Sequence, residues 1–175
     1  RGLGASRLAR TVCAAATGAA AQAMYGKMPG VGYEDYVDAR LIVIWGANTT
    51  TTGMHLVPFI TTARARGAAL GGIDTRRRKL ALLADLHRPI PPGADLPVAL
   101  SVIRHLFEQG HADLRFLAGH TTGAGDLRAA ALPWSLERAA EVAGIETAAL
   151  RRFADLYAER APSVIRCGSG LERNR

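Results

Sequence analysis

The side chains that could do chemistry in this 175-residue sequence gather in two polar stretches, each directly after an apolar run. Residues 46–52 follow the run Leu-Ile-Val-Ile-Trp and contain a glycine, an asparagine and four threonines. Residues 74–78 follow a second apolar run and read Asp-Thr-Arg-Arg-Arg. Turn N–H groups and arginines bind phosphate, and an aspartate placed like Asp74 often binds a ribose hydroxyl. The two stretches are therefore the first candidates for a nucleotide or phosphate site.

Cys13 is the second candidate, because it directly precedes an alanine-rich run that predicts a helix ending at Gly26. A helix N-terminus favours the thiolate, which is both a nucleophile and a ligand for soft metals. A buried structural cysteine is the alternative, since free cysteine packs as a small hydrophobe. Cys167 is too distant for a CxxC motif, and two cysteines are too few for a disulfide framework.

Other signatures of catalysis are absent from the sequence. There is no Walker A motif, no GxGxxG after a strand and no GxSxG elbow, so kinase, ordinary NAD-binding and hydrolase interpretations lack their residues. The histidines show no metal-ligand spacing such as HExxH, and we expect them to be structural or exposed. They are His55, His87, His105, His111 and His120.

The elements that must position these residues are two strands joined by a crossover. The β-branched run at 41–45 predicts a strand buried on both faces, and residues 68–74 predict a second. A helical crossover between them implies parallel strands, whose carboxyl ends bind ligands in open α/β sheets. The fold class is therefore α/β, with a mostly parallel sheet.

The rest of the chain predicts helices and a final strand. Residues 92–95 predict a turn in which Asp95 is the N-cap of a helix ending near Gly110. Residues 111–132 predict short helices and loops. Two amphipathic helices are expected at 135–142 and 145–160, and residues 163–170 predict a short strand entering a glycine loop.

Composition is that of one globular domain, with 49% hydrophobic and 21% charged residues. The excess of 22 Lys and Arg over 15 Asp and Glu favours an acidic partner, either a dinucleotide cofactor, an acidic neighbouring domain or nucleic acid. Scattered arginines and few aromatic residues argue against nucleic acid. No apolar run approaches the roughly 20 residues that span a bilayer, so membrane insertion is not expected. Because the sequence starts at Arg1 without an initiator methionine, we expect an excerpt of a longer or processed protein. The compartment stays open between the cytoplasm and the periplasm.

Five short motifs in order resemble the dimethyl sulfoxide reductase family, the molybdenum or tungsten enzymes that carry two molybdopterin guanine dinucleotides. The resemblance covers essentially the whole chain. The Cys-Gly-Ser-Gly sequence at 167–170 is similar to the family's glycine loop near the metal. The motifs are Cys13 before the alanine-rich helix, residues 41–48 (Leu-Ile-Val-Ile-Trp-Gly-Ala-Asn), 73–76 (Ile-Asp-Thr-Arg), 84–85 (Ala-Asp) and 92–95 (Pro-Gly-Ala-Asp).

The resemblance implies a fold, a cofactor and a set of site residues. The fold would be a Rossmann-like three-layer α/β domain, and the cofactor bis-molybdopterin guanine dinucleotide with molybdenum or tungsten. Cys13 takes the position of the catalytic metal ligand. The implied cofactor-binding residues are Trp45, Gly46, Asn48 and Thr51 for a pyrophosphate, Asp74, Thr75 and Arg76 for the guanosine end, Gly93 and Asp95 for a further nucleotide contact, and Gly168 and Gly170 in the glycine loop.

The resemblance also implies an organisation and partners. Residues 1–40 would be the metal-ligand segment with its leading helix, residues 41–162 the dinucleotide-binding domain, and residues 163–175 a strand and glycine loop leading to the next part of a parent protein. The partners would be the parent's remaining domains, a small-molecule substrate and an electron-transfer subunit. They would lie outside this chain, as would an upstream iron-sulfur cluster. The chain alone is expected to be inactive.

The sequence departs from the family at four positions. Thr49 and Thr75 stand where proline is usual, and Ala94 where threonine is usual. Ala14 stands where formate dehydrogenases place a histidine, which argues against formate oxidation. Two alternatives stay open: a non-catalytic α/β nucleotide-binding domain, and a basic nucleic-acid-binding module that uses residues 76–79.

Overall fold

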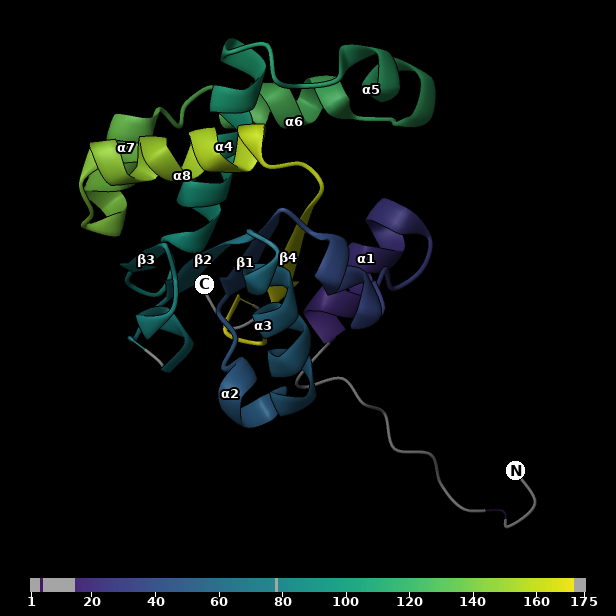
Figure 1. Cartoon of the computed structure of the whole chain (residues 1–175). Coiled ribbons are helices and arrows are strands. Elements are labelled where there is room, and N and C mark those ends of the chain that lie inside the picture. The colour runs from purple at the N-terminus through teal and green to yellow at the C-terminus, as the bar shows by residue number, and fades with distance from the viewer. Residues whose placement is uncertain (1–3, 5–14, 78, 172–175) are drawn as a thin grey trace.

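The computed structural model describes residue 4, residues 15–77 and residues 79–171, so Cys13, Ala14 and Arg78 lie outside the described residues. A four-stranded parallel sheet forms the centre, with helices on both of its faces (Figure 1). Its strand order is β3-β2-β1-β4. The strands are β1 (Leu41–Trp45), β2 (Ala69–Asp74), β3 (Leu86–Pro89) and β4 (Ser163–Cys167).

Strand β1 is the centre of the sheet because every one of its residues is apolar and buried. It pairs in parallel with β2, where Leu41 lies opposite Ala69, and with β4, where Leu41 lies opposite Ser163. A strand covered on both faces needs apolar side chains at every position, as the sequence predicted. Strand β4, which the sequence analysis assigned to the segment 163–175, is thus part of this sheet. The division of the chain at residues 40 and 162 stays a prediction.

Successive side chains of β1 point to opposite faces of the sheet and enter two separate cores. On one face, Ile42 and Ile44 pack with Leu56 and Ile60, which come from the crossover between β1 and β2. On the other face, Val43 and Trp45 belong to a core with residues of α4, α7 and α8. The result is the predicted three-layer arrangement of helices, sheet and helices.

The segments that the sequence predicted to be helical are helical in the structure, apart from differences at their ends. The crossover between β1 and β2 consists of α2 (Thr49–Thr52), the 3-10 helix η2 (Met54–Leu56) and α3 (Val57–Ala65). The second helical layer contains α4 (Asp95–Glu108), α7 (Leu136–Ala143) and α8 (Thr147–Glu159). The others are α1 (Ala15–Tyr25), η1 (Glu34–Asp38), η3 (Lys79–Leu82), α5 (Leu114–His120) and α6 (Ala124–Ala131).

Two features differ from the prediction. Strand β3 was not predicted, because Leu-His-Arg-Pro carries no apolar run, and it forms by pairing with β2 at the sheet edge. The N-cap position of α4 is occupied by Ala94 rather than by Asp95, which is the first residue of the helix itself. Within residues 15–77 and 79–171, none of the helices combines the length and apolar composition needed to cross a bilayer.

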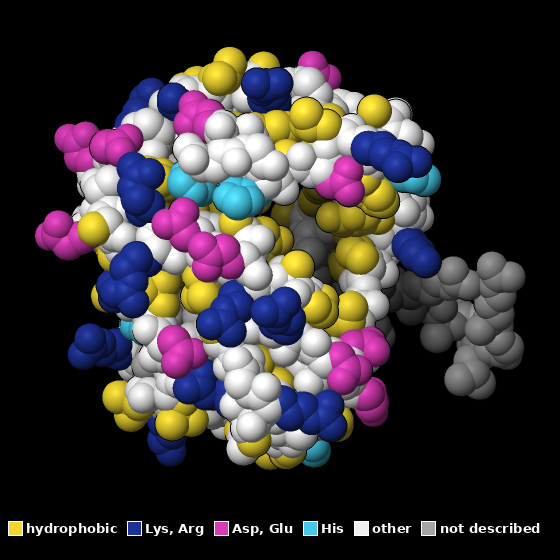
Figure 2. All heavy atoms as spheres, turned by 45° about the horizontal axis from the view of Figure 1, so that its top comes forward, with side chains coloured by type: hydrophobic (Ala, Val, Ile, Leu, Met, Phe, Trp, Pro, Cys, Tyr) yellow, Lys and Arg dark blue, Asp and Glu magenta, His cyan; other side chains and the backbone are white. Residues whose placement is uncertain are grey.

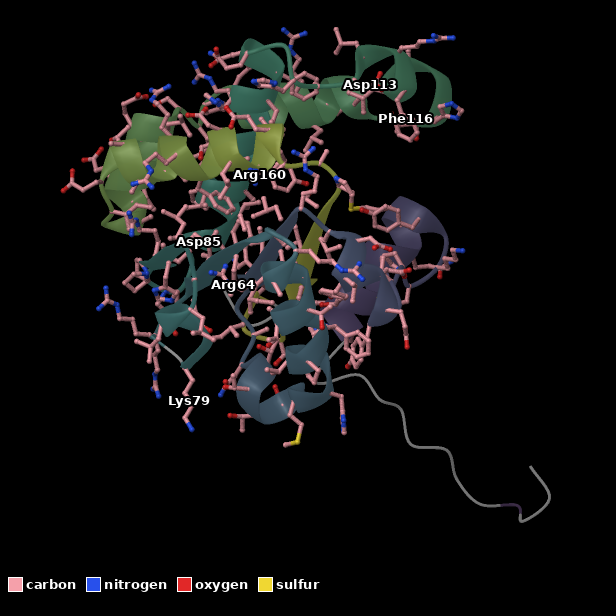
Figure 3. All side chains as sticks on the ribbon, in the orientation of Figure 1. Arg64, Lys79, Asp85, Asp113, Phe116 and Arg160 are labelled. Atoms are coloured by element: carbon pink, nitrogen blue, oxygen red, sulfur yellow. The ribbon has the colours of Figure 1, made fainter. Side chains whose placement is uncertain are left out.

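Charged side chains of both signs are interspersed over the face that Figure 2 displays, where Lys and Arg alternate with Asp and Glu. An ion pair connects α3 to the start of β3: Arg64 of α3 donates to Asp85, just before β3, over 2.7 Å and 3.3 Å. Figure 3 labels both side chains. The same carboxylate accepts the backbone N–H of Leu70 in β2, at 2.7 Å. Asp85 therefore holds α3, β2 and the start of β3 together.

Candidate functional site

Four loops meet at one edge of the sheet because all four strands are parallel. They are residues 46–48 after β1, 75–77 after β2, 90–94 after β3 and 168–171 after β4. From β1 the chain proceeds to β2 and β3 on one side, and returns to the other side of β1 for β4. The loops after β1 and β4 therefore flank a topological switch point, where open α/β sheets have their ligand crevice.

The loops at the switch point pack backbone against backbone. The N–H of Gly168 donates to the carbonyl oxygen of Trp45 at 2.9 Å. A Cβ added to Gly168 would overlap the carbonyl oxygen of Gly46 and lie 2.7 Å from the Cα of Ala47, and one added to Gly170 would lie 2.9 Å from the same Gly46 oxygen. Gly46 itself has a φ of +59°. These three glycines are thus required by the packing of the two loops, and their contact with a cofactor stays a prediction.

Trp45 and Asp95, 50 residues apart, contact each other directly. The indole N–H of Trp45 donates to Asp95 Oδ1 at 2.7 Å. The indole is otherwise buried and meets the ring of Phe153 edge-on, with 6.3 Å between centroids. Trp45 therefore fixes the half-buried carboxylate of Asp95 from inside the core. Gly93, with a φ of +91°, forms the exposed turn that brings the chain to this point.

The loop after β1 is held by its own polar side chains. The hydroxyl of Thr50 donates to Asn48 Oδ1 at 3.1 Å, and that of Thr52 donates to the Asn48 carbonyl at 3.0 Å. Thr51 is exposed at the surface of the loop. The hydroxyl of Thr49 is buried without a hydrogen-bond partner among the described residues. A buried hydroxyl without a partner is uncommon, because its desolvation is not compensated.

The loop after β2 begins with a turn around Asp74. Its Oδ1 accepts the backbone N–H of Arg76 at 3.2 Å and the hydroxyl of Thr75 at 3.3 Å. Thr75, Arg76 and the neighbouring Arg77 are exposed, so this loop presents two guanidinium groups to solvent. The sequence-predicted residues 74–76 thus form one compact local unit.

His87 lies beneath this loop, and sequence reasoning gave it no functional role. It lines a small cavity of about 20 Å³ together with Gly72, Asp74 and Arg76, which is room for about one water molecule. Its Nδ1 is buried without a partner among the described residues. Burial first, and then the nearby Arg77, lower the pKa of His87 from its ordinary value, which favours the neutral ring. Only the three-dimensional pairing of β3 with β2 could have revealed this position.

The metal-ligand prediction falls on Cys13, outside the described residues. Within residues 15–77 and 79–171, no group of three or more His, Cys, Asp and Glu side chains is arranged to hold a metal ion. Cys167, at the end of β4, is a free and exposed cysteine. The described edge therefore offers hydroxyl, amide, carboxylate and guanidinium groups, which suit a nucleotide rather than a metal ion bound by protein alone.

An all-parallel sheet with helices on both faces and a cluster of loops at one edge defines a Rossmann-like α/β domain. Acetylene hydratase from Pelobacter acetylenicus has a domain of this fold, with a TM-score of 0.70 and 22% identity over 77% of this chain and 19% of that one. No protein-family model matches the chain.

Curated relatives of the chain include several oxidoreductases. The probable oxidoreductase YoaE of Bacillus subtilis is 33% identical over 98% of this chain. The assimilatory nitrate reductase of Haloferax mediterranei is 30% identical over 94% of it, and the alpha subunit of an F420-dependent formate dehydrogenase of Methanococcus maripaludis is 29% identical over 76%. The chain spans 25%, 23% and 20% of the lengths of these relatives. It is homologous to one segment of the molybdopterin oxidoreductases, as the sequence motifs indicated.

Proposed function

We propose that this chain is the segment of a molybdenum- or tungsten-dependent oxidoreductase that binds one molybdopterin guanine dinucleotide at the carboxyl edge of its sheet. In this proposal Cys13 supplies a thiolate to the metal. The observation that carries it is the convergence of the loops after β1, β2 and β3 on one edge, with Trp45 hydrogen-bonded to Asp95 between two of them. Three of the five motifs that resemble the family, residues 41–48, 73–76 and 92–95, include residues of these loops.

The chemistry of the edge fits a dinucleotide. The Thr49 hydroxyl lacks a partner and lies in the loop proposed to take the pyrophosphate. Arg76 and Arg77 are exposed at the neighbouring loop, where they would lower the energy of a bound phosphate. Gly46, Gly168 and Gly170 let the loops after β1 and β4 pack closely, so that these two loops would flank the cofactor at the switch point.

Each residue has a separate task in the proposed site. Asp74, held in its turn by the Arg76 N–H, would accept hydrogen bonds from the guanosine end. Asp95, fixed by the Trp45 indole, would contact the nucleotide between the loops after β1 and β3. The bound metal-pterin supplies oxygen-atom transfer or electron-coupled proton transfer. The small-molecule substrate, the electron-transfer partner, any iron-sulfur cluster and the remaining domains belong to the proposed parent protein, and the chain by itself would be inactive.

The test measures guanine nucleotide retained by the full-length parent protein after desalting and acid release. Asp74→Ala should lower the retained nucleotide about tenfold, since a lost charge-assisted hydrogen bond weakens binding by about 1.5 kcal/mol or more. Asp126→Ala, on α6, is the control and should retain the wild-type amount. Equal nucleotide in the Asp74 variant and the wild type would contradict the proposed site. Absence of guanine nucleotide from folded wild-type protein would favour the non-catalytic alternative.

A further inference from the structure

Helix α1 carries no charged side chain on any face, and Thr17 and Gln22 are its polar residues, yet it is almost entirely open to solvent. Its sequence, Ala-Ala-Thr-Gly-Ala-Ala-Ala-Gln-Ala-Met-Tyr, contains no charged residue. Ala21 is its only buried residue. Helices that are apolar on all sides are normally buried, because water-facing positions otherwise carry polar side chains. The composition of α1 therefore does not match its surroundings in this chain.

The same is true of the residues that follow α1. Met24, Tyr25, Met28 and Val31 are 71%, 59%, 58% and 53% exposed, all within eight positions. Single exposed hydrophobic residues are ordinary, but a contiguous group of them marks an interaction site. We call α1 together with residues 26–31 the α1 surface.

Helix α7 provides an internal comparison. It is also short and alanine-rich, but it buries Leu136, Ala139, Ala140 and Ala143 and exposes charged residues such as Glu141. This chain thus places charges on the outer face of a helix that remains at the surface. No face of α1 carries charged residues. The helix therefore also lacks the charged face of a helix that lies on a membrane surface.

We propose that the α1 surface is an internal interface, covered by another part of the same, longer polypeptide. This inference rests on the proposed function, in which the chain is a segment of a larger enzyme. Almost the whole chain, 98%, aligns with only 25% of YoaE, so three quarters of such a protein lies outside the aligned segment. Permanent interfaces are apolar and depleted of charge, whereas transient ones resemble the ordinary surface. The α1 surface has the composition of a permanent interface, with Lys27 as its one charged residue.

The methionines of the chain make the test possible. Met24, Met28 and Met54 are 71%, 58% and 58% exposed in this structure, and Met54 lies in η2 rather than on the α1 surface. The full-length protein is treated with hydrogen peroxide, and each methionine sulfoxide is quantified by mass spectrometry. The proposal expects Met24 and Met28 to remain reduced when Met54 is fully oxidised. Oxidation of all three at the same rate would overturn it.

A pair of substitutions gives a second readout that does not depend on Met54. Ala23 is exposed on α1 and Ala148 is exposed on α8, and glutamate is a good helix former at both. In the full-length protein, Ala23→Glu should lower the melting temperature or the soluble yield, while Ala148→Glu should change neither. Equal behaviour of the two variants would overturn the proposal.

Two further outcomes are informative. If protection of Met24 and Met28 is lost on dilution and a dimer dissociates in parallel, the covering partner is a second copy and the proposal is wrong. Guanine nucleotide is measured on the same preparation. Protected Met24 and Met28 without bound guanine nucleotide would support the interface and contradict the proposed function. Oxidised Met24 and Met28 with bound guanine nucleotide would support the proposed function and contradict the interface.

Discussion

At the scale of single residues, the contact between Gly168 and Gly46 decides whether the loops after β1 and β4 can meet. A methyl group on Gly168 would overlap the Gly46 carbonyl oxygen. We expect Gly168→Ala to lower the free energy of unfolding by about 1–3 kcal/mol, because one of the loops must move. Urea unfolding followed by circular dichroism measures this change.

The control for this prediction is Gly119→Ala in α5, where an added Cβ would meet no atom within 4 Å. Alanine at this helical position should be neutral or stabilise by up to about 1 kcal/mol. Similar stabilities for the two variants would show that the loops are not packed as described.

Asp85 is a second residue that stabilises the fold by joining separate elements, since it binds both Arg64 of α3 and the Leu70 N–H of β2. Hydrogen bonds from Arg64, together with the Leu70 N–H, hold the pKa of Asp85 below its ordinary value of 3.8. Because this pKa is lower in the folded chain, the ionised carboxylate stabilises the fold above the unfolded pKa, and the contribution is lost as the pH falls through the folded pKa. Asp85→Asn should lower the free energy of unfolding by about 1–2 kcal/mol at neutral pH, since both partners are partly exposed.

Denaturant titrations at neutral pH and below about pH 4 test the sign of this effect, because the difference between wild type and Asp85→Asn should shrink in acid. Asp38→Asn is the matched control. Asp38 also pairs with an arginine, Arg66, but over 3.3 Å and with an 83% exposed carboxylate side chain. It should change stability by less than about 0.5 kcal/mol. A pH-independent difference for Asp85→Asn would contradict the account.

At the scale of elements, α8 is anchored to the sheet and α5 is not. Phe153 of α8 is 4% exposed and meets Trp45 edge-on, whereas Phe116 of α5 is 54% exposed and lies far from the sheet in Figure 3. We expect Phe153→Ala to destabilise the fold by about 3–5 kcal/mol through the cavity that it leaves. Phe116→Ala should cost less than about 1 kcal/mol. Thermal unfolding of both variants compares them, and equal losses would mean that the helical layer is packed differently.

Most elements could be predicted because their signals are local. The apolar β-branched residues at 41–45 can fit only a strand covered on both faces, and the amphipathic spacing at 145–160 fits only a helix with one buried face. Strand β3 lacks such a signal, since His87 and Arg88 are half-buried and its order comes from pairing with β2. Its existence follows from the neighbouring strand rather than from its own residues.

The same distinction applies to the candidate site. The loops after β1 and β2 were found from sequence because polar residues that follow buried strands share one edge of a parallel sheet. The Trp45–Asp95 hydrogen bond joins residues 50 positions apart, and no local pattern encodes it. The N-cap assigned to Asp95 was wrong because the turn at residues 92–94 ends one residue earlier. The packing of Gly168 on Gly46 likewise appears only when β4 lies beside β1.

At the scale of the whole molecule, the chain is one α/β layer structure that corresponds to a quarter or less of the length of its relatives. Its net charge of +7 and its loops at one edge suit a dinucleotide partner, and the α1 surface suits a larger protein around it. Both proposals concern the same parent enzyme, in which this domain would hold the nucleotide end of the cofactor and Cys13 the metal.

The measurement that tests this account most directly is the metal and guanine nucleotide content of the full-length parent protein, wild type beside Cys13→Ala. Elemental analysis and acid release are made on the same folded samples. The account predicts molybdenum or tungsten with about two guanine nucleotides per metal, as a bis-dinucleotide cofactor requires. It also predicts an altered metal spectrum or lost activity in Cys13→Ala. A folded wild-type protein that holds neither metal nor guanine nucleotide, although it was produced with both available, would contradict the account.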